Sequence, residues 1–167
     1  EDEKPVYELL AAGEISTLRK TIGYSLLAGV AMSMYLWSWP PGVWLFGILA
    51  VFFIFHLSIE HVRGRSPEHT ALVGIVSLST AGILQLSTVR TFDTTVASRS
   101  LIQPGLAFVV VFGLIFMAWL SREVESREFS RTAYPGIVGG ILVVGTVVVA
   151  LALPELFSFF FNQVDRG

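Results

Sequence analysis

The sequence predicts an all-α fold, a polytopic transmembrane helix bundle with about five membrane-spanning helices. Composition is the first observation behind this prediction: the 167 residues are 53% hydrophobic and 14% charged, whereas soluble domains carry about a quarter charged residues. The second is charge placement, because four intervals contain no Asp, Glu, Lys or Arg: 21–59, 69–89, 100–121 and 132–154. A helix needs roughly 20 apolar residues to cross a bilayer, so each interval can hold at least one crossing.

The first interval is long enough for two crossings and contains Pro40-Pro41-Gly42 at its centre. Because this tripeptide cannot continue a helix, we expect two helices joined by a tight turn. Tryptophans on both sides of the turn, including Trp39 and Trp44, favour a position at the membrane–water boundary. The helices are therefore expected near 21–39, 42–62, 69–89, 101–121 and 134–153. Residues 1–20 form a cytoplasmic stub in this prediction, 21–161 the transmembrane bundle, and 162–167 the start of an external loop.

The distribution of basic residues predicts the orientation. One set of connecting segments holds eight basic residues and the opposite set holds three, Arg90, Arg99 and Arg166. Cytoplasmic loops carry the excess of lysine and arginine, so the first set is placed in the cytoplasm. The N-terminus is then cytoplasmic and the C-terminus extracytoplasmic, in a multi-pass protein of the cell membrane.

Composition excludes several functions. The chain contains no cysteine, which rules out disulfides, thiolate metal sites and thiol nucleophiles. The net charge of −2 gives no reason to expect a nucleic-acid partner. No ionisable residue lies in the middle of an expected span, which argues against a transporter, because buried charges mark ion and proton paths. We predict no catalytic residue and no metal ligand set in this chain.

One histidine cluster resembles a set of metal ligands. His56 and Glu60 lie four residues apart and share a helix face, with His61 and His69 nearby. The spacing matches no zinc-protease motif, and the cluster lies at the end of an expected span, where polar side chains reach the headgroups. We therefore expect a structural role.

Two helices carry small residues at four-residue steps. Ser25, Gly29 and Ser33 form one such series, and Gly136 and Gly140 form a GxxxG pair. Small residues let helices approach closely in lipid, so packing inside the bundle is expected, with a dimer face or a lipid-tail groove as the alternative. Gln85 and Gln103 are the most polar side chains in or near the spans, and each is expected to bond to a neighbouring helix.

Arg90 and Arg99 are the weak candidates for substrate binding. They lie in an expected external loop together with Asp93. Two arginines there could hold a phosphate by charge-assisted hydrogen bonds. An ordinary solvated loop carries charges of this kind as well, and the sequence leaves both interpretations open.

Five stretches carry a family resemblance. They are EKPVYELL at 3–10, GYSLLAGVA at 23–31, YLWSWPPGV at 35–43, VRGRSPEH at 62–69 and IQPG at 102–105. Together they resemble the membrane domain of archaeal, most closely haloarchaeal, oligosaccharyltransferase catalytic subunits of the AglB type. Those enzymes have a multi-spanning domain of the glycosyltransferase C class and a soluble domain. The resemblance extends over essentially the whole chain.

The resemblance implies protein N-glycosylation by a longer enzyme. The family transfers a glycan from a dolichol-linked carrier to a sequon asparagine, with a divalent cation, Mg²⁺ or Mn²⁺, held by carboxylates. The family's acidic and sequon-binding motifs do not occur in this sequence. We therefore expect a scaffold fragment of the membrane domain, inactive alone, whose partners are the bilayer, the dolichol-linked oligosaccharide and the rest of the parent. The alternative is a small non-enzymatic membrane subunit of a larger complex.

Overall fold

The computed structural model describes residues 6–12, 15–39, 42, 44–89, 100–127 and 129–152. These residues form six helices and no strand, as expected for an all-α chain. A short helix, α1 (Val6–Ala11), precedes five long ones. The long helices are α2 (Ile15–Ser38), α3 (Trp44–Val62), α4 (Glu68–Leu86), α5 (Ile102–Ser126) and α6 (Ala133–Ala152).

Each long helix overlaps one range expected from the uncharged intervals, with differences at the ends. α2 begins at Ile15 rather than near 21, and α5 continues to Ser126 rather than ending near 121. Both extensions contain charged residues, because a helix leaving the bilayer can continue in water where its side chains are solvated. The expected stub at 1–20 therefore contains α1 and the first turns of α2.

Three helices are long and apolar enough to cross a membrane: α3, α4 and α5. The described apolar part of α6, Ala133–Gly145, is shorter than a full span. α2 does not meet the same criteria within the described residues, and its first turns contain Arg19 and Lys20. The membrane helix bundle is thus confirmed, while the count of five crossings stays a prediction.

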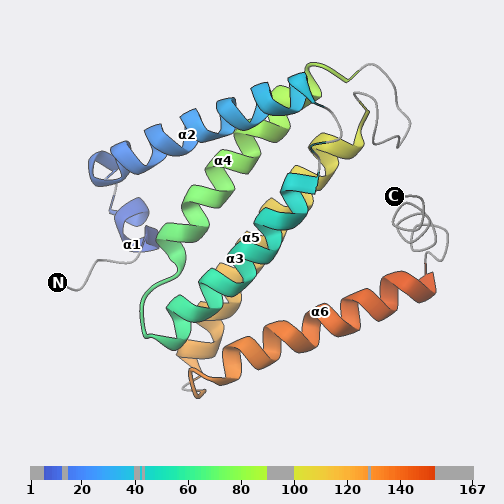
Figure 1. The fold of residues 1–167 in the computed structure, drawn as a ribbon. Helices are drawn as coiled ribbons and strands as arrows, with labels where there is room; N and C mark the ends of the chain where they lie inside the picture. The colour runs from blue at the N-terminus through green and yellow to red at the C-terminus, as the bar shows by residue number, and fades with distance from the viewer. Residues whose placement is uncertain are drawn as a thin grey trace.

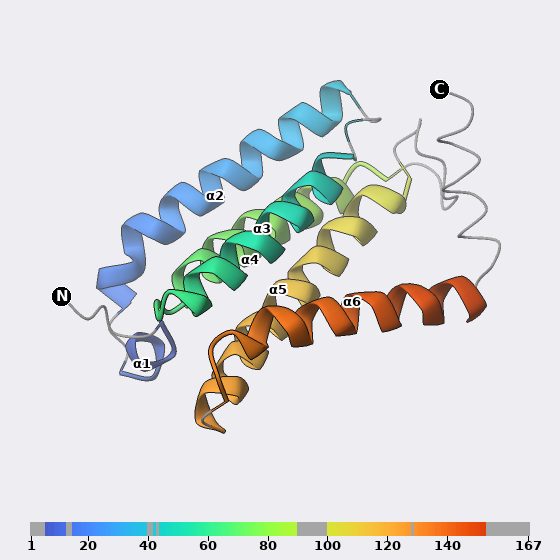
Figure 2. The same cartoon turned by 60° about the horizontal axis from the view of Figure 1, so that its bottom comes forward.

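The long helices run alternately up and down, and α4 lies at the centre (Figure 1). α2 packs along one side of α4 and α5 along another, while α3 packs against α5. α6 meets α3 and α5 near its own start and then diverges from them, as Figures 1 and 2 both show. Its buried side chains among those described, Tyr134 and Val138, belong to its first two turns.

Small residues bring α2 and α4 into close contact. Ser25 and Ser33 are buried, and a Cβ atom at Gly29 would lie 2.5 Å from the backbone oxygen of Ser77. The Ser33 hydroxyl donates to the Ala81 carbonyl at 3.3 Å, and Gln85 Nε2 donates to the Ser33 carbonyl at 3.1 Å. The expected packing face of α2 and the expected interhelical bond of Gln85 are therefore confirmed.

The glycines of α6 differ from expectation. A Cβ atom at Gly136 or Gly140 would meet nothing within 4 Å, so this GxxxG pair does not pack inside the described bundle. Gly136 is exposed although it lies between the buried Tyr134 and Val138, and Gly140 follows these packed first turns of α6. Gln103 Oε1 accepts hydrogen bonds from the backbone and hydroxyl of Ser100, so these contacts stay at the start of its own helix.

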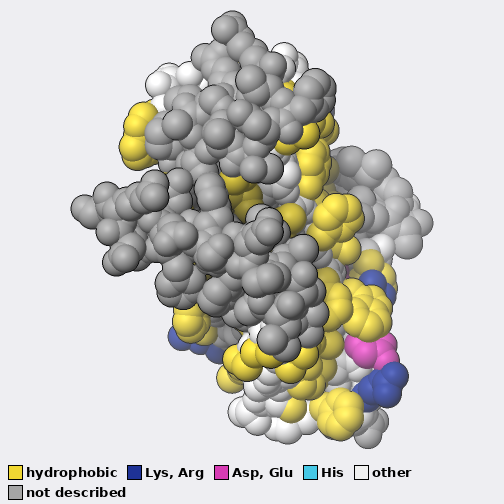
Figure 3. All heavy atoms as spheres, turned by 90° about the vertical axis from the view of Figure 1, so that its right-hand side faces the viewer, with side chains coloured by type: hydrophobic (Ala, Val, Ile, Leu, Met, Phe, Trp, Pro, Cys, Tyr) yellow, Lys and Arg dark blue, Asp and Glu magenta, His cyan; other side chains and the backbone are white. Residues whose placement is uncertain are grey.

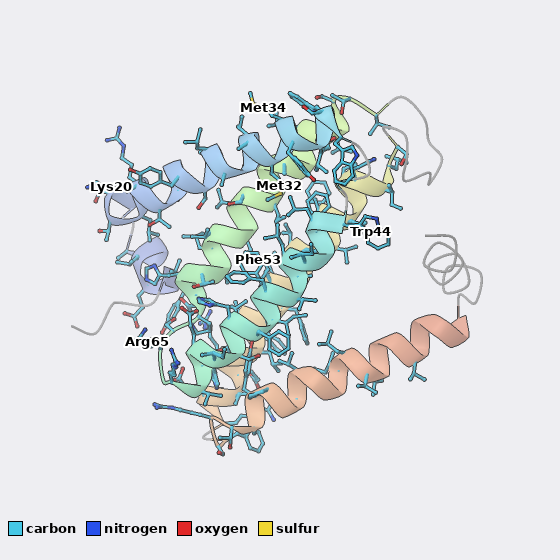
Figure 4. The ribbon with its side chains drawn as sticks, in the orientation of Figure 1. Lys20, Met32, Met34, Trp44, Phe53 and Arg65 are labelled. Atoms are coloured by element: carbon cyan, nitrogen blue, oxygen red, sulfur yellow. The ribbon has the colours of Figure 1, made fainter. Side chains whose placement is uncertain are left out.

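The hydrophobic core runs along the α3–α4–α5 contact. Phe53, Leu78 and Leu114 are buried in it, and Phe53 points from α3 into the bundle (Figure 4). Gly74 makes this contact possible, since a Cβ atom there would lie 2.6 Å from Leu114 Cδ1 and 2.8 Å from Phe53 Cζ. At Gly74, α4 is therefore packed between side chains of α3 and α5.

Large apolar side chains cover much of the outer surface. Phe112 is 70% exposed, Ile48 66% and Phe55 65%, although each belongs to a helix of membrane-spanning length. Soluble monomers rarely expose so much apolar surface. Figure 3 shows hydrophobic side chains over one face, with charged side chains gathered toward its lower end. This surface is suited to lipid.

Candidate functional site

A hollow of about 800 Å³ lies at the end of the bundle where α3 and α5 end. It is bordered by α1, by the turn between α3 and α4, and by the end of α5 with the turn that follows. Figure 4 places Lys20 and Arg65 toward this end of the bundle and Trp44 toward the opposite end. The hollow is therefore on the side that the arginine distribution assigns to the cytoplasm.

Glu68, the first residue of α4, ties α1 to the rest of the hollow. One carboxylate oxygen accepts the backbone N–H of Tyr7 at 3.1 Å, and the other lies 3.8 Å from Arg122 Nε. The Arg122 guanidinium also lies 4.0 Å from the centre of the Tyr7 ring, in cation–π geometry. A carboxylate at a helix N-terminus is favoured by the exposed N–H groups there, so Glu68 fixes the start of α1.

The apolar side of α1 completes its docking. Val6 and Leu9 are buried against Leu18 of α2, with Leu72 of α4 packed against the same cluster. The Tyr7 hydroxyl on the exposed side donates to Glu8 at 3.1 Å, and this bond and the Glu8 charge raise the pKa of Tyr7. Sequence reasoning did not predict α1, because the docking of this helix depends on residues of α2 and α4.

His61 forms the inner wall of the hollow, at the end of α3. Its Nδ1 shares a hydrogen bond of 2.6 Å with the Ser121 hydroxyl, and its ring stacks on Tyr134 with a centroid distance of 4.4 Å. Tyr134 in turn donates its hydroxyl to the Met117 carbonyl at 3.1 Å. These contacts join α3, α5 and α6 at one point. His61 is 5% exposed, and its Nε2 has no hydrogen-bond partner in the described chain.

The turn after α3 requires a glycine. Gly64 has a φ of +72°, which side-chain-bearing residues rarely adopt. The Arg65 N–H bonds to the Glu60 carbonyl and the Gly64 N–H to the His61 carbonyl, which is the Schellman arrangement at a helix C-terminus. A Cβ atom at Gly64 would also collide with the guanidinium of Arg131. The turn thus brings Arg65 and Arg131 to the same hollow.

The histidine cluster predicted from the sequence is divided between different partners. His56 Nε2 lies 3.5 Å from Glu60, which also accepts the Thr70 hydroxyl at 3.1 Å, whereas His61 bonds to Ser121. Within the described residues, no group of three or more His, Asp or Glu side chains could hold a metal ion. The described residues therefore do not fit a divalent cation.

The weak substrate-binding candidates Arg90 and Arg99 lie outside the described residues, as does Asp93. The hollow instead collects Arg65, Arg122 and Arg131, which belong to the eight basic residues of the segments predicted to be cytoplasmic. Arg65 and Arg131 are 66 positions apart, so no local motif connects them. The sequence indicated their proximity in one way only: both arginines belong to segments predicted to lie on the same, more basic side of the membrane.

Comparison with known proteins gives one clear result. The chain is 42% identical, over 93% of its length, to the dolichyl-monophosphooligosaccharide–protein glycotransferase AglB of Haloferax volcanii. The resemblance to the AglB type is confirmed. The chain spans 15% of the length of this AglB, so it corresponds to a segment of the larger protein. No family model matches the chain, and no solved structure shows significant similarity to it.

Proposed function

We propose that the chain is a membrane scaffold segment of an AglB-type glycosyltransferase, an enzyme that transfers a dolichol-linked glycan to sequon asparagines. The 42% identity to the Haloferax volcanii AglB over almost the whole chain carries this proposal. It is supported by the all-helical bundle with three helices of spanning length. The packed α3–α4–α5 core supplies the rigidity that a scaffold requires.

In this proposal the chemistry belongs to the longer protein. The divalent cation, Mg²⁺ or Mn²⁺, is held by carboxylates outside this segment. The segment alone is inactive, and it contributes helices against which the remaining crossings, the soluble domain and the polyprenyl chain pack. Gly136 and Gly140 of α6 have open space around them, which supports packing of the remaining crossings against this helix. Helices associate in lipid through faces of such small residues.

The orientation is part of the same proposal, with the N-terminus cytoplasmic and the C-terminus extracytoplasmic. A cysteine introduced at Ser126 and one introduced at Asp93 test it, because the chain has no cysteine of its own. An impermeant maleimide added to intact cells should label Asp93→Cys and leave Ser126→Cys unlabelled. The reverse pattern would contradict the orientation.

A chimera tests the proposed function. The matching segment of the Haloferax volcanii AglB is replaced by this chain in cells that lack their own AglB, and glycosylation of a reporter glycoprotein is measured by mass spectrometry. We expect the chimera to restore glycosylation and the 167-residue chain alone to leave the reporter unmodified. A chimera that reaches the membrane in normal amounts without restoring glycosylation would favour the non-enzymatic subunit.

A further inference from the structure

The hollow at the arginine-bearing end has the properties of a headgroup site. Its lining includes Trp119 and Phe129, which are 54% and 56% exposed, beside the arginines of the α3–α4 and α5–α6 turns. Tryptophan is enriched at membrane interfaces, where one part of the ring meets hydrocarbon and another meets water. Trp119 lies on α5, a helix of spanning length, close to the charged end of that helix.

The charges of the hollow leave two arginines without a partner. Glu68 pairs with Arg122, and Glu123 pairs with Arg127 at 2.6 Å. Arg65 and Arg131 form no ion pair in the described chain, and the remaining acidic side chain of the lining is Glu125. A guanidinium presents paired N–H donors that match the oxygens of a phosphate. The three arginines of the lining match its three glutamates in number, and Arg127, which pairs with Glu123 from outside the lining, leaves one positive charge in excess.

His61 adds an independent observation. Its side chain is almost fully buried in the wall, Ser121 occupies its Nδ1, and its Nε2 has no partner. Buried polar atoms of native proteins nearly always have a partner, so the unpaired Nε2 of His61, a residue of the lining, is an exception. A phosphate oxygen or a glycerol hydroxyl is a partner of the kind that this nitrogen lacks.

We propose that this hollow binds the headgroup of an anionic phospholipid, with its phosphate between Arg65 and Arg131. The exposed aromatic rim favours a lipid over free phosphate, because an acyl chain leaving the hollow continues along the apolar outer surface of the bundle. This proposal concerns the end of the bundle opposite to the end of α4 and the start of α5, and it does not rest on the proposed glycosyltransferase role.

Trp119 provides the probe. The other three tryptophans lie around the turn between α2 and α3, so a variant with Trp37, Trp39 and Trp44 changed to phenylalanine reports on Trp119 alone. This variant is reconstituted in phosphatidylcholine vesicles that contain either brominated phosphatidylglycerol or brominated phosphatidylcholine. We expect stronger quenching of Trp119 by the brominated anionic lipid.

Matched charge removals separate a site from general attraction to a basic surface. Arg65→Gln with Arg131→Gln should abolish the excess quenching. Arg19→Gln with Lys20→Gln removes the same number of charges outside the lining and should preserve the excess. His61→Phe, which keeps an aromatic ring against Tyr134, should reduce it. Equal quenching by both lipids, or loss of the excess in the Arg19/Lys20 variant, would overturn the proposal, as would its removal by added inorganic phosphate.

Discussion

α2 and α6 both carry small residues at four-residue spacing, yet the two faces have different surroundings. Gly29 of α2 is covered by Ser77 and Thr80 of α4, with no space for a side chain. Gly136 and Gly140 of α6 have open space around them in the described chain. The two helices therefore carry a similar pattern of small residues. They differ because the described chain provides a helix opposite the α2 face and none opposite the α6 face.

Exposure of the neighbouring side chains gives the same contrast. On α6, Val143 is 65% and Val144 62% exposed, and Ile141 and Leu142 are also exposed. On α2, Leu18 and Leu36 are buried, although Leu27 is 65% exposed. A lipid-facing helix explains exposed valines, but the additional run of glycines indicates a protein neighbour, because lipid tails require no flat surface.

Gly29→Leu should have the largest effect on the chain itself. The new side chain has to separate α2 from the α4 backbone, and overpacking of this kind costs about 1–3 kcal/mol of unfolding free energy. The measurement is reversible unfolding of the chain in mixed micelles. Gly23→Leu is the matched control on the same helix, because a Cβ atom there meets nothing within 4 Å. Equal destabilisation by both changes would contradict the close α2–α4 contact.

Gln85→Leu should have an intermediate effect. The change removes the hydrogen bond from Gln85 to the Ser33 carbonyl. Leucine replaces the polar amide by an apolar side chain of similar length. Interhelical hydrogen bonds in membrane proteins contribute about 0.6 kcal/mol on average, so a loss of unfolding free energy near that value is expected. Ser87→Ala, at the exposed end of α4, serves as the control. A stabilised Gln85→Leu variant would argue against the bond.

Gly140→Leu should have the smallest effect on the isolated chain. No described atom lies near the new side chain, and substitutions away from packed features stay within about 0.5 kcal/mol. The same micelle unfolding experiment measures it. A loss as large as that of Gly29→Leu would mean that the α6 face packs within the chain after all.

Sequence reasoning recovered the features that depend on local pattern. Uncharged intervals located the long helices, because bilayer thickness fixes how many apolar residues a crossing needs. The serine and glycine spacing of α2 and the isolated Gln85 also predicted interhelical contacts correctly. These features can be read from one stretch of sequence without knowledge of the neighbouring helix.

Features that depend on distant residues were not recovered. α1 forms against Glu68, 61 positions from Tyr7, and the hollow joins Arg65 to Arg131 across two helices. The surroundings of the α6 glycines were also wrongly expected, because spacing shows that a face can pack but not where its partner lies. His61 illustrates the same limit, since its bond to Ser121 spans 60 positions.

We propose that this chain is one part of a longer AglB-type protein and that another part of that protein covers the α6 face. Gly140→Leu in the AglB chimera tests it most directly, with reporter glycosylation measured by mass spectrometry and chimera abundance by immunoblot. We expect glycosylation to fall sharply although the same change leaves the isolated chain stable. Glycosylation equal to that of the unsubstituted chimera would contradict it.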